Sequence, residues 1–334
     1  MNKISIIGLG LTGNSIGLGL KQATGDTVRV TGFDPEQSRE QYALRKYKSV
    51  DEIAPDLERA VRGAGLVIIC TPLTAALEVF EAISPFLDAN ATVTDTMPLK
   101  EPVIRMAEEA LGPGKSFIGG HPFSLTVDLD VVGDEITPSA DLFRAAPWCI
   151  MPARGAGNSA LNTVINLAET LGAKPLFIDP VEHDSFLAAV SHLPVAVSIA
   201  FLKAVAGSPA WTDMSALAHG RFREVSHGVG YDPRMLADTI SQNRGPLLRW
   251  IDGYMEALYD VRSLLATGDV EALVEALAEA NKSRRAWADP GEADAEDARL
   301  RTELRQAINE SRPSQALMGT YLTEKLFRRK ERGH

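Results

Sequence analysis

The 334-residue chain is long enough for two domains, and a composition of 45% hydrophobic and 23% charged residues is typical of a soluble globular protein. Its net charge of −10 opposes binding to a phosphate backbone, so we expect no nucleic-acid partner. Two cysteines, Cys70 and Cys149, cannot form a disulfide framework or a four-cysteine metal site, and no signal-peptide pattern opens the chain, which predicts a cytoplasmic protein.

Apolar strands alternate with helical segments over residues 1–179. The strands are predicted at 3–7, 28–33, 66–70, 91–94, 116–118, 148–151 and 175–178. Helical periodicity fills the intervals at 15–21, 75–86, 102–111 and 159–171. The strand at 66–70 shows no polar alternation, as expected of a strand buried on both faces. This order predicts an α/β domain with a doubly wound parallel sheet.

Strand signals end after residue 179, and only helices are predicted beyond it, at 186–206, 233–265, 270–287, 298–310 and 316–327. The apolar segment 186–206 approaches membrane-spanning length, but it contains His192, Pro194 and Lys203, so we interpret it as a buried helix and expect no membrane association. One small helical layer would hardly bury that helix, which favours a homodimer. The chain thus divides into an α/β domain at 1–179, an all-α substrate and dimerisation domain at 180–286, and a helical extension at 287–334.

A glycine turn joins the first predicted strand to the first helix. The turn comprises Gly8, Leu9, Gly10, Leu11, Thr12 and Gly13. Its first glycine permits a tight turn, its second lets the backbone approach a pyrophosphate, and its third allows the helix to pack closely on the strand. The helix N-terminus then offers N–H groups to the phosphates. The turn therefore predicts a Rossmann-type dinucleotide-binding domain.

Residues at the ends of the next two strands are predicted to complete the cofactor site. Asp34 ends the second strand, where a carboxylate can bind the ribose hydroxyls and disfavours the extra phosphate of NADP. We therefore expect NAD rather than NADP. Thr71, Pro72 and Leu73 follow the third strand, and the carboxyl ends of parallel strands face the ligand crevice. These three residues are expected to line the ribose or nicotinamide side of the cofactor.

Two histidines are candidates for acid–base chemistry. His121 follows a predicted strand directly, and an imidazole has a pKa suited to proton transfer near neutrality. His192 lies on the apolar helix, where a satisfied core residue is the ordinary interpretation. No Cys or carboxylate stands at metal-ligand spacing, so we predict no metal site. The residues alone therefore predict an NAD-dependent oxidoreductase with one or two candidate acid–base histidines.

Several motifs together resemble the prephenate/arogenate dehydrogenase family of tyrosine biosynthesis. They are GLGLTGNSIGLGLK at 8–21, GGHP at 119–122, HDSFLAAVSHLP at 183–194 and the run FRE…DPRML…QN between 222 and 243. The resemblance implies an NAD-dependent oxidative decarboxylation of prephenate to 4-hydroxyphenylpyruvate or of arogenate to tyrosine. It implies that His121 accepts a hydrogen bond from the ring hydroxyl and that His192 shapes the pocket. It also implies a helical dimerisation domain, with the active site between the two domains.

The sequence departs from the family pattern in four places: at Pro98, in the loop 123–125, at His227, and from about residue 286 onward. Pro98 stands where a serine is usual, although Thr96 is nearby, and Ser124 follows GGHP as a possible substitute hydroxyl. The family arginine that grips the ring carboxylate falls on His227, and an imidazole lacks the bidentate fork of a guanidinium. A nearby arginine such as Arg223 is one candidate to compensate. The predicted substrate-binding residues are Thr96, Ser124, Ser191, His227 and Arg223.

Three functions remain open from the sequence. The first is a prephenate or arogenate dehydrogenase with compensating residues at the carboxylate site. The second is a diverged NAD-dependent dehydrogenase that acts on another cyclic or hydroxy-acid substrate, which the changes at Pro98 and His227 favour. The third is a non-catalytic NAD-binding module. The presence of both histidines within their full motifs argues against it, because a protein that only binds NAD does not need them. The extension at 287–334 is expected to pack on the dimer.

Overall fold

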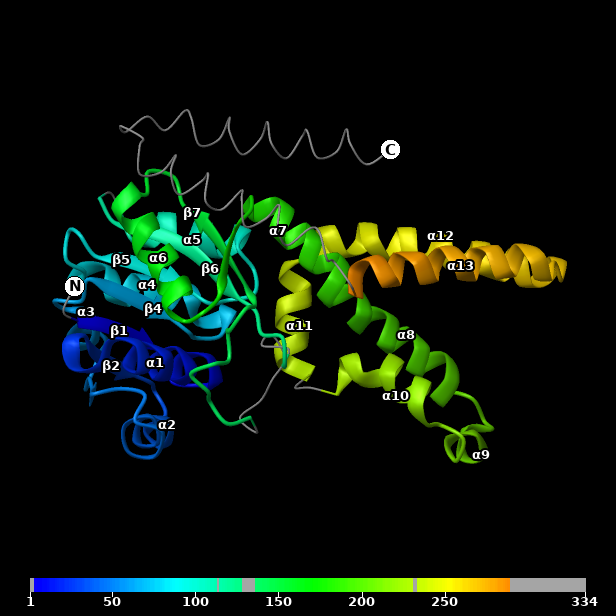
Figure 1. The fold of residues 1–334 in the computed structure, drawn as a ribbon, viewed down its shortest axis with the longest axis horizontal. Helices are drawn as coiled ribbons and strands as arrows, with labels where there is room; N and C mark the ends of the chain where they lie inside the picture. The colour runs from blue at the N-terminus through cyan, green and yellow to red at the C-terminus, as the bar shows by residue number, and fades with distance from the viewer. Residues whose placement is uncertain (1–2, 113, 128–135, 231–232, 289–334) are drawn as a thin grey trace. The chain divides into compact units, whose positions relative to one another are not determined.

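A computed structural model describes residues 3–112, 114–127, 136–230 and 233–288 (Figure 1). The helices predicted at 298–310 and 316–327 lie outside these residues, as does almost all of the predicted extension. The chain forms two compact units, residues 1–257 and residues 258–334.

The first unit is built on one sheet in the order β3-β2-β1-β4-β5-β6-β7-β8. Its strands are β1 (Lys3–Ile7), β2 (Arg29–Phe33), β3 (Glu52–Ile53), β4 (Leu66–Ile69), β5 (Thr92–Asp95), β6 (Ser116–Pro122), β7 (Pro147–Pro152) and β8 (Lys174–Phe177). The strand order reverses between β1 and β4, and ligands of doubly wound sheets bind at such a switch point. All strands but the two-residue β3 are predicted by their apolar runs.

Strands β3 to β6 are parallel, as predicted, but β7 pairs antiparallel with β6 and β8 follows the direction of β7. The expectation of a wholly parallel sheet is therefore wrong for these two strands. The described residues between β6 and β7 contain no helix, and antiparallel neighbours need no helical crossover. As a result, His121 on β6 lies opposite Cys149 on β7.

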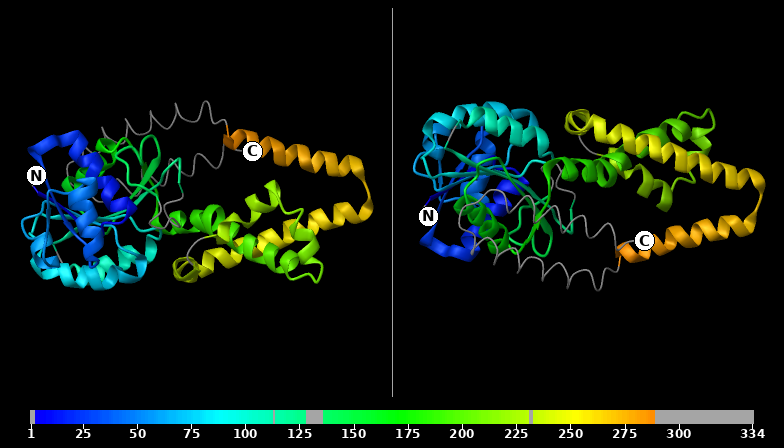
Figure 2. Two further views of the ribbon diagram at one scale, coloured as in Figure 1. Left: turned by 90° about the horizontal axis from the view of Figure 1, so that it is seen from below. Right: turned by 90° about the horizontal axis from the view of Figure 1, so that it is seen from above.

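Helices cover both faces of the sheet (Figures 1 and 2). They include α1 (Leu11–Thr24), α3 (Leu57–Val61), α4 (Ala76–Ile83), α5 (Glu101–Ala110) and α6 (Asn158–Thr170). Helices α3, α4 and α5 pack on one another in sequence, while α1 contacts α6. The apolar side chains under α3 to α5 form a buried core that includes Ile69, Phe80, Val93 and Val103. A short helix, α2 (Gln37–Gln41), follows β2 and continues as a π-helical turn at Tyr42–Tyr47.

The predicted apolar helix begins earlier than expected and has three parts. These are α7 (Pro180–Leu187), a π-helical turn (Ala188–His192) and α8 (Leu193–Ala206). Asp179 caps α7 by accepting the N–H groups of Val181 and Glu182 at 2.9 and 3.2 Å. Pro194 has no N–H to donate to the preceding turn, which is consistent with the wider π-helical turn that ends at His192.

The expectation that this helix is buried is wrong for the single chain. Only 28% of its apolar window is covered, and Phe186, Val190 and Ile199 are exposed. By length and composition, Pro180–Ala206 is also the one described helix that could cross a membrane, a test that a core helix of a soluble protein passes as well. We therefore expect a second surface to cover the exposed apolar side chains of this helix.

The helix predicted at 233–265 is interrupted. Two helices, α11 (Pro233–Gln242) and α12 (Arg244–Thr267), meet at Asn243, which is not helical. Gly245 and Pro246 follow directly, and both disfavour a continuous helix through this point. Before them lie α9 (Trp211–Ser215), α10 (Gly220–Ser226) and a 3-10 turn at His227–Val229.

The described part of the second unit consists of the end of α12 and the helix α13 (Val270–Ala288). A turn at Gly268, with φ of +68°, joins the two helices. Large apolar side chains are exposed on both, namely Leu258, Tyr259, Leu265, Val270, Val274, Leu277 and Trp287. Exposed apolar patches of this kind mark interaction surfaces.

Candidate active site

The glycine turn between β1 and α1 is shaped for a dinucleotide. Gly8 has φ of +96°, and a Cβ on it would lie 2.5 Å from the carbonyl oxygen of Cys70. A Cβ on Gly13 would lie 2.0 Å from the carbonyl oxygen of Gly8, whereas a Cβ on Gly10 would meet no atom within 4 Å. Gly10 is also the N-cap of α1 and provides no side-chain cap. The first-turn N–H groups therefore face open space that fits a pyrophosphate.

Asp34 is held beside this turn. Its carboxylate accepts the N–H of Leu9 at 2.8 Å with one oxygen and the N–H of Glu36 at 2.9 Å with the other. Asp34 is 4% exposed. A carboxylate has about four acceptor positions, so two remain for the hydroxyls of a ribose. The predicted position of Asp34 at the carboxyl end of β2 is confirmed, and its role toward the cofactor stays a prediction.

The segment after β4 also reaches this edge of the sheet. Leu73 is buried and begins a 3-10 turn, and Pro72 precedes that turn. The hydroxyl of Thr71 is buried and has no hydrogen-bond partner within the described part of the chain. Such a hydroxyl fits a contact with a bound ligand. Thr96 follows β5, and its main-chain N–H donates to the carbonyl oxygen of Ile69 at 3.0 Å. Its predicted role in substrate binding stays a prediction.

His121 lies in a buried chain of polar side chains. Its Nδ1 is 3.0 Å from Nε2 of His183, and Nδ1 of His183 is 2.8 Å from Oδ1 of Asp184. The exposed fractions of these three residues are 1%, 2% and 3%. Burial lowers the pKa of His183 to about 4 despite its hydrogen bond to Asp184. His183 is therefore neutral near pH 7.

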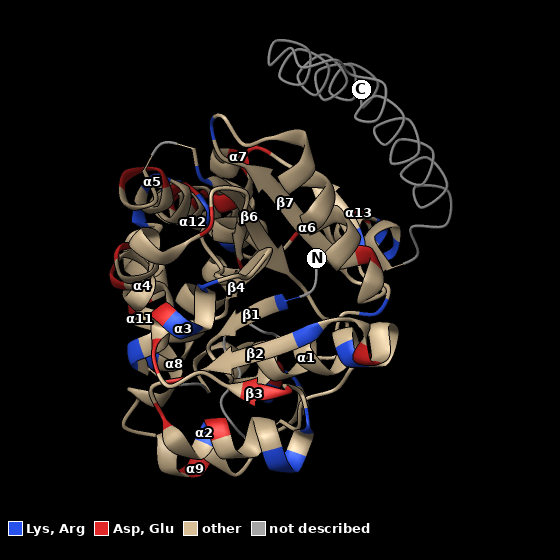
Figure 3. Cartoon of the chain, turned by 90° about the vertical axis from the view of Figure 1, so that its left-hand side faces the viewer, with Lys and Arg blue, Asp and Glu red and all other residues tan. Residues whose placement is uncertain are grey.

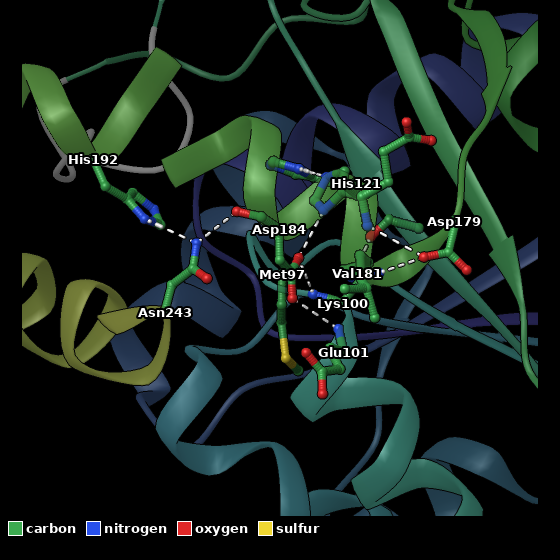
Figure 4. A network of polar contacts seen from close by, with 12 residues as sticks. Met97, Lys100, Glu101, His121, Asp179, Val181, Asp184, His192 and Asn243 are labelled. Carbon is green, nitrogen blue, oxygen red and sulfur yellow. Dashed lines mark hydrogen bonds and ion pairs between the residues drawn. The ribbon is translucent and has the colours of Figure 1, made fainter. Parts of the chain in front are cut away.

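Asp184 joins α7 to the start of α5 (Figure 4). Its Oδ1 accepts the N–H of Lys100 and its Oδ2 accepts the N–H of Glu101, each at 2.9 Å. The carboxylate thus caps α5, where the helix dipole favours negative charge. Asp184 belongs to α7 and is bound to the start of α5, so its carboxylate has a fixed position. That position in turn orients the ring of His183, which contacts it.

A fully buried ion pair supports the strand that carries His121. Lys100 pairs with Asp95, and its Nζ also donates to the carbonyl oxygen of Gly120 at 2.6 Å. Asp95 accepts the N–H of Gly120 at 3.0 Å. Both polar groups of Gly120 are thereby bound just before His121. A buried pair with additional hydrogen bonds of this kind fixes geometry more than it adds stability.

His192 approaches the same cluster from the π-helical turn. The Nδ2 atom of Asn243 lies 3.2 Å from Nδ1 of His192 and donates to the carbonyl oxygen of Asp184 at 2.7 Å (Figure 4). His192 and Asn243 are each 3% exposed. We refer to the five residues His121, His183, Asp184, His192 and Asn243 as the histidine cluster.

Several predicted site residues lie outside the histidine cluster. Ser124 is on an exposed loop, where its hydroxyl lies 3.0 Å from that of Thr126. Arg223 and His227 are exposed on α10 and the following 3-10 turn, which pack against α8. Ser191 precedes His192 and is partly buried. The roles of these residues toward substrate stay predictions.

Sequence reasoning missed His183, Asp184 and Asn243 as site residues. His183 and Asp184 open the family motif at 183–194, but the sequence assigns a role only to His192 and Ser191 at the end of that motif. Asn243 ends the run at 222–243, but the sequence places it within a predicted continuous helix and assigns it no role. The signal that could have found it is the Asn-Arg-Gly-Pro sequence, which predicts a helix break. The two cysteines near the site are not nucleophiles, because burial raises the pKa of each thiol to about 12.

The chain is similar to proteins named cyclohexadienyl, prephenate and arogenate dehydrogenase. The cyclohexadienyl dehydrogenase of Zymomonas mobilis is 28% identical over 285 residues, which cover 85% of this chain and 95% of that protein. A crystal structure of prephenate dehydrogenase from A. aeolicus, in complex with hydroxyphenyl propionate and NAD+, matches with a TM-score of 0.75 and 25% identity and covers 85% of this chain and 98% of that chain. Synechocystis arogenate dehydrogenase matches with a TM-score of 0.73 and 29% identity, over 85% and 99% of the two chains.

Two profiles of one family match the chain in succession. The first, "Prephenate dehydrogenase, nucleotide-binding domain", covers residues 16–176. The second, "Prephenate dehydrogenase, dimerization domain", covers residues 179–279. They meet beside the domain boundary that the sequence predicts at residue 179. The resemblance seen in the sequence motifs is confirmed, and the chain belongs to the prephenate dehydrogenase family.

Proposed function

We propose that this protein catalyses the NAD-dependent oxidative decarboxylation of prephenate or arogenate. The observation that carries the proposal is the buried His121, which ends β6 at the same edge of the sheet as the glycine turn that follows β1. A dinucleotide on that turn and a substrate beside His121 would then meet at one site. The relative from A. aeolicus, which binds NAD+ and hydroxyphenyl propionate, supports this pairing of ligands.

The residues of the chain divide the work between binding and proton movement. Bound NAD supplies the acceptor for the hydride that leaves the ring carbon bearing the hydroxyl. Gly10 and the first turn of α1 bind the pyrophosphate, and Asp34 binds the ribose. His121 accepts the hydroxyl proton while a carbonyl forms and returns it to that oxygen as the ring carboxylate leaves as carbon dioxide. Aromatisation of the ring makes the overall step irreversible.

Preference for NAD over NADP is part of the proposal. Asp34 is buried and is held by Leu9 and Glu36, so it cannot swing away from a phosphate on the ribose. A fixed carboxylate at that position repels the extra phosphate of NADP.

A cytoplasmic homodimer is proposed as well, without nucleic-acid or membrane partners. The apolar face of α8 and the match to a dimerization domain support the homodimer. At α2 and α3, basic and acidic residues alternate along the chain (Figure 3), and they form ion pairs such as Arg62–Glu58 at 2.7 Å and Arg39–Glu36 at 3.2 Å. This mixture opposes a basic surface for nucleic acid.

A second candidate function rests on His227. An imidazole occupies the position of the family arginine that grips the ring carboxylate, and it is exposed on the turn after α10. A dehydrogenase for another cyclic or hydroxy-acid substrate, without that carboxylate, is therefore the alternative.

The experiment is NADH formation by the purified protein with prephenate and with arogenate, each with NAD and with NADP. Turnover of either substrate with NAD supports the first proposal. If neither prephenate nor arogenate is turned over while calorimetry shows that NAD binds, the result would favour a dehydrogenase for another cyclic or hydroxy-acid substrate.

A further inference from the structure

We propose that Asp184 fixes the two active-site histidines in opposite tautomers, with His183 and Asn243 as positioning residues. The side chain of Asp184 acts on His121 through His183, and its main-chain carbonyl acts on His192 through Asn243 (Figure 4). The use of these tautomers in catalysis rests on the proposed function, whereas the tautomers themselves follow from the hydrogen bonds.

The connection to His121 begins at a carboxylate. Asp184 in its ionised form only accepts hydrogen bonds, so the Nδ1 atom of His183, 2.8 Å from it, carries a hydrogen. His183 is neutral near pH 7, because burial holds its pKa near 4, so its Nε2 atom bears a lone pair. That lone pair faces Nδ1 of His121 at 3.0 Å. His121 therefore donates from Nδ1, and its neutral form carries the lone pair on Nε2.

The connection to His192 begins at a main-chain carbonyl. The carbonyl oxygen of Asp184 only accepts, so the side-chain atom of Asn243 that lies 2.7 Å from it is the amide nitrogen. The same nitrogen has a second hydrogen, which faces Nδ1 of His192 at 3.2 Å. Nδ1 of His192 is therefore an acceptor, and the neutral ring carries its hydrogen on Nε2. His192 thus has the tautomer opposite to that of His121.

The two tautomers suit different tasks in the proposed reaction. A lone pair on Nε2 lets His121 take the proton of the substrate hydroxyl. A hydrogen on Nε2 lets His192 donate a hydrogen bond to a carboxylate or carbonyl oxygen of the substrate or cofactor. The contact between Nδ1 of His121 and Nε2 of His183 at 3.0 Å makes His183 a positioning residue for the ring of His121. A wrong tautomer in a histidine base costs several orders of magnitude in rate in other enzymes.

The direct test is the tautomer of each ring, measured by long-range ¹H–¹⁵N correlation spectra of the full-length protein labelled with ¹⁵N-histidine, without substrate, at pH 8. Single histidine substitutions assign the signals. The expected spectra show Nδ1–H for His121 and for His183, and Nε2–H for His192. Finding Nε2–H on His121, or Nδ1–H on His192, would overturn the proposal.

Variants separate positioning from folding. His183→Leu removes the acceptor for His121, whereas His183→Gln retains a side-chain oxygen that reaches the position of Nε2. We expect the Nδ1–H signal of His121 to be lost in His183→Leu and kept in His183→Gln, with kcat/KM reduced at least about tenfold in the first and recovered in part in the second. The matched control is His219→Leu, because His219 is exposed and outside the cluster.

Asn243→Leu tests the other connection, with Asn166→Leu on the exposed face of α6 as its control. The expected result is a changed tautomer for His192 and an unchanged tautomer for His121. Equal tautomers in Asn243→Leu and the wild type would contradict the role of Asn243. The spectra do not depend on the substrate, so correct tautomers without turnover of prephenate or arogenate would refute the proposed function and leave this inference intact.

Discussion

The Nδ1 atom of His121 and the Nε2 atom of His183 lie 3.0 Å apart in an environment that excludes water. His121 comes from the end of β6 and His183 from α7, so the contact exists only when the α/β part of the first unit and the helices that follow it are assembled. The site is therefore a product of tertiary structure, and its parts respond differently to substitution.

The buried, neutral His183 predicts that stability falls in acid. In the unfolded chain its pKa is near 6.5, and in the folded protein it is about 4, so the unfolded state takes up a proton first as the pH falls. This contribution is complete above pH 6.5 and is lost between pH 6.5 and 4, by about 3 kcal/mol. This contribution is measured by urea unfolding of the wild type and of His183→Gln at pH 7 and at pH 4. The unfolding free energy of the wild type, relative to that of His183→Gln, should be lower at pH 4 than at pH 7 by about 3 kcal/mol. An equal difference at pH 7 and pH 4 would contradict the pKa.

Gly10 and Gly13 should respond differently to alanine. A Cβ on Gly10 meets nothing within 4 Å, so Gly10→Ala is expected to fold normally but to raise the KM for NAD about tenfold by blocking the approach of the pyrophosphate. A Cβ on Gly13 would collide with the carbonyl oxygen of Gly8, so Gly13→Ala should lower the melting temperature. Thermal unfolding and NAD titration of both variants check this. An unchanged KM for NAD in Gly10→Ala would contradict the assignment of this glycine turn to pyrophosphate binding.

The buried pair of Lys100 and Asp95 predicts a large asymmetry between buried and exposed ion pairs. Lys100→Met leaves the Asp95 carboxylate buried without its cation and should cost about 3–5 kcal/mol of unfolding free energy. Arg62→Met removes one member of the exposed pair with Glu58 and should cost less than about 1 kcal/mol. Both are measured by urea unfolding. Similar losses in the two variants would show that the Lys100 pair is not buried in solution.

Asp34 predicts the choice of cofactor. Asp34→Ser removes the negative charge near the ribose, so the ratio of kcat/KM for NAD to that for NADP should fall at least about tenfold. Asp26→Ser, at the exposed turn after α1, is the control and should leave the ratio unchanged. An unchanged ratio of kcat/KM for NAD to that for NADP in Asp34→Ser would contradict the binding of the ribose by Asp34.

The sequence predicts the parts of this protein that depend on local spacing. The glycine turn and the strand before it follow from short motifs, because each is decided by neighbouring residues. His121 is predicted just past a strand at 116–118, whereas β6 extends to Pro122 and includes it. The family resemblance extended this to a role for His192, which its apolar helix alone argues against.

The parts that sequence reasoning missed depend on contacts between distant segments. His121 and His183 are 62 residues apart, and Asn243 is 59 residues from Asp184. Nothing local shows that Asp184 turns inward to cap α5, or that Asn243 leaves its helix to reach His192. The reversal of β7 also depends on a connection without a described helix, which strand patterns do not reveal.

The most direct test of the proposed function couples two products in one reaction. Carbon dioxide release and NADH formation are measured together, with prephenate or arogenate and NAD, for the wild type and for His121→Asn. We expect one carbon dioxide for each NADH in the wild type, and a loss of about 10²- to 10⁴-fold in kcat for His121→Asn with its fold and NAD affinity retained. An undiminished kcat in the folded variant, or NADH without carbon dioxide, would contradict the assignment of His121 to an oxidative decarboxylation.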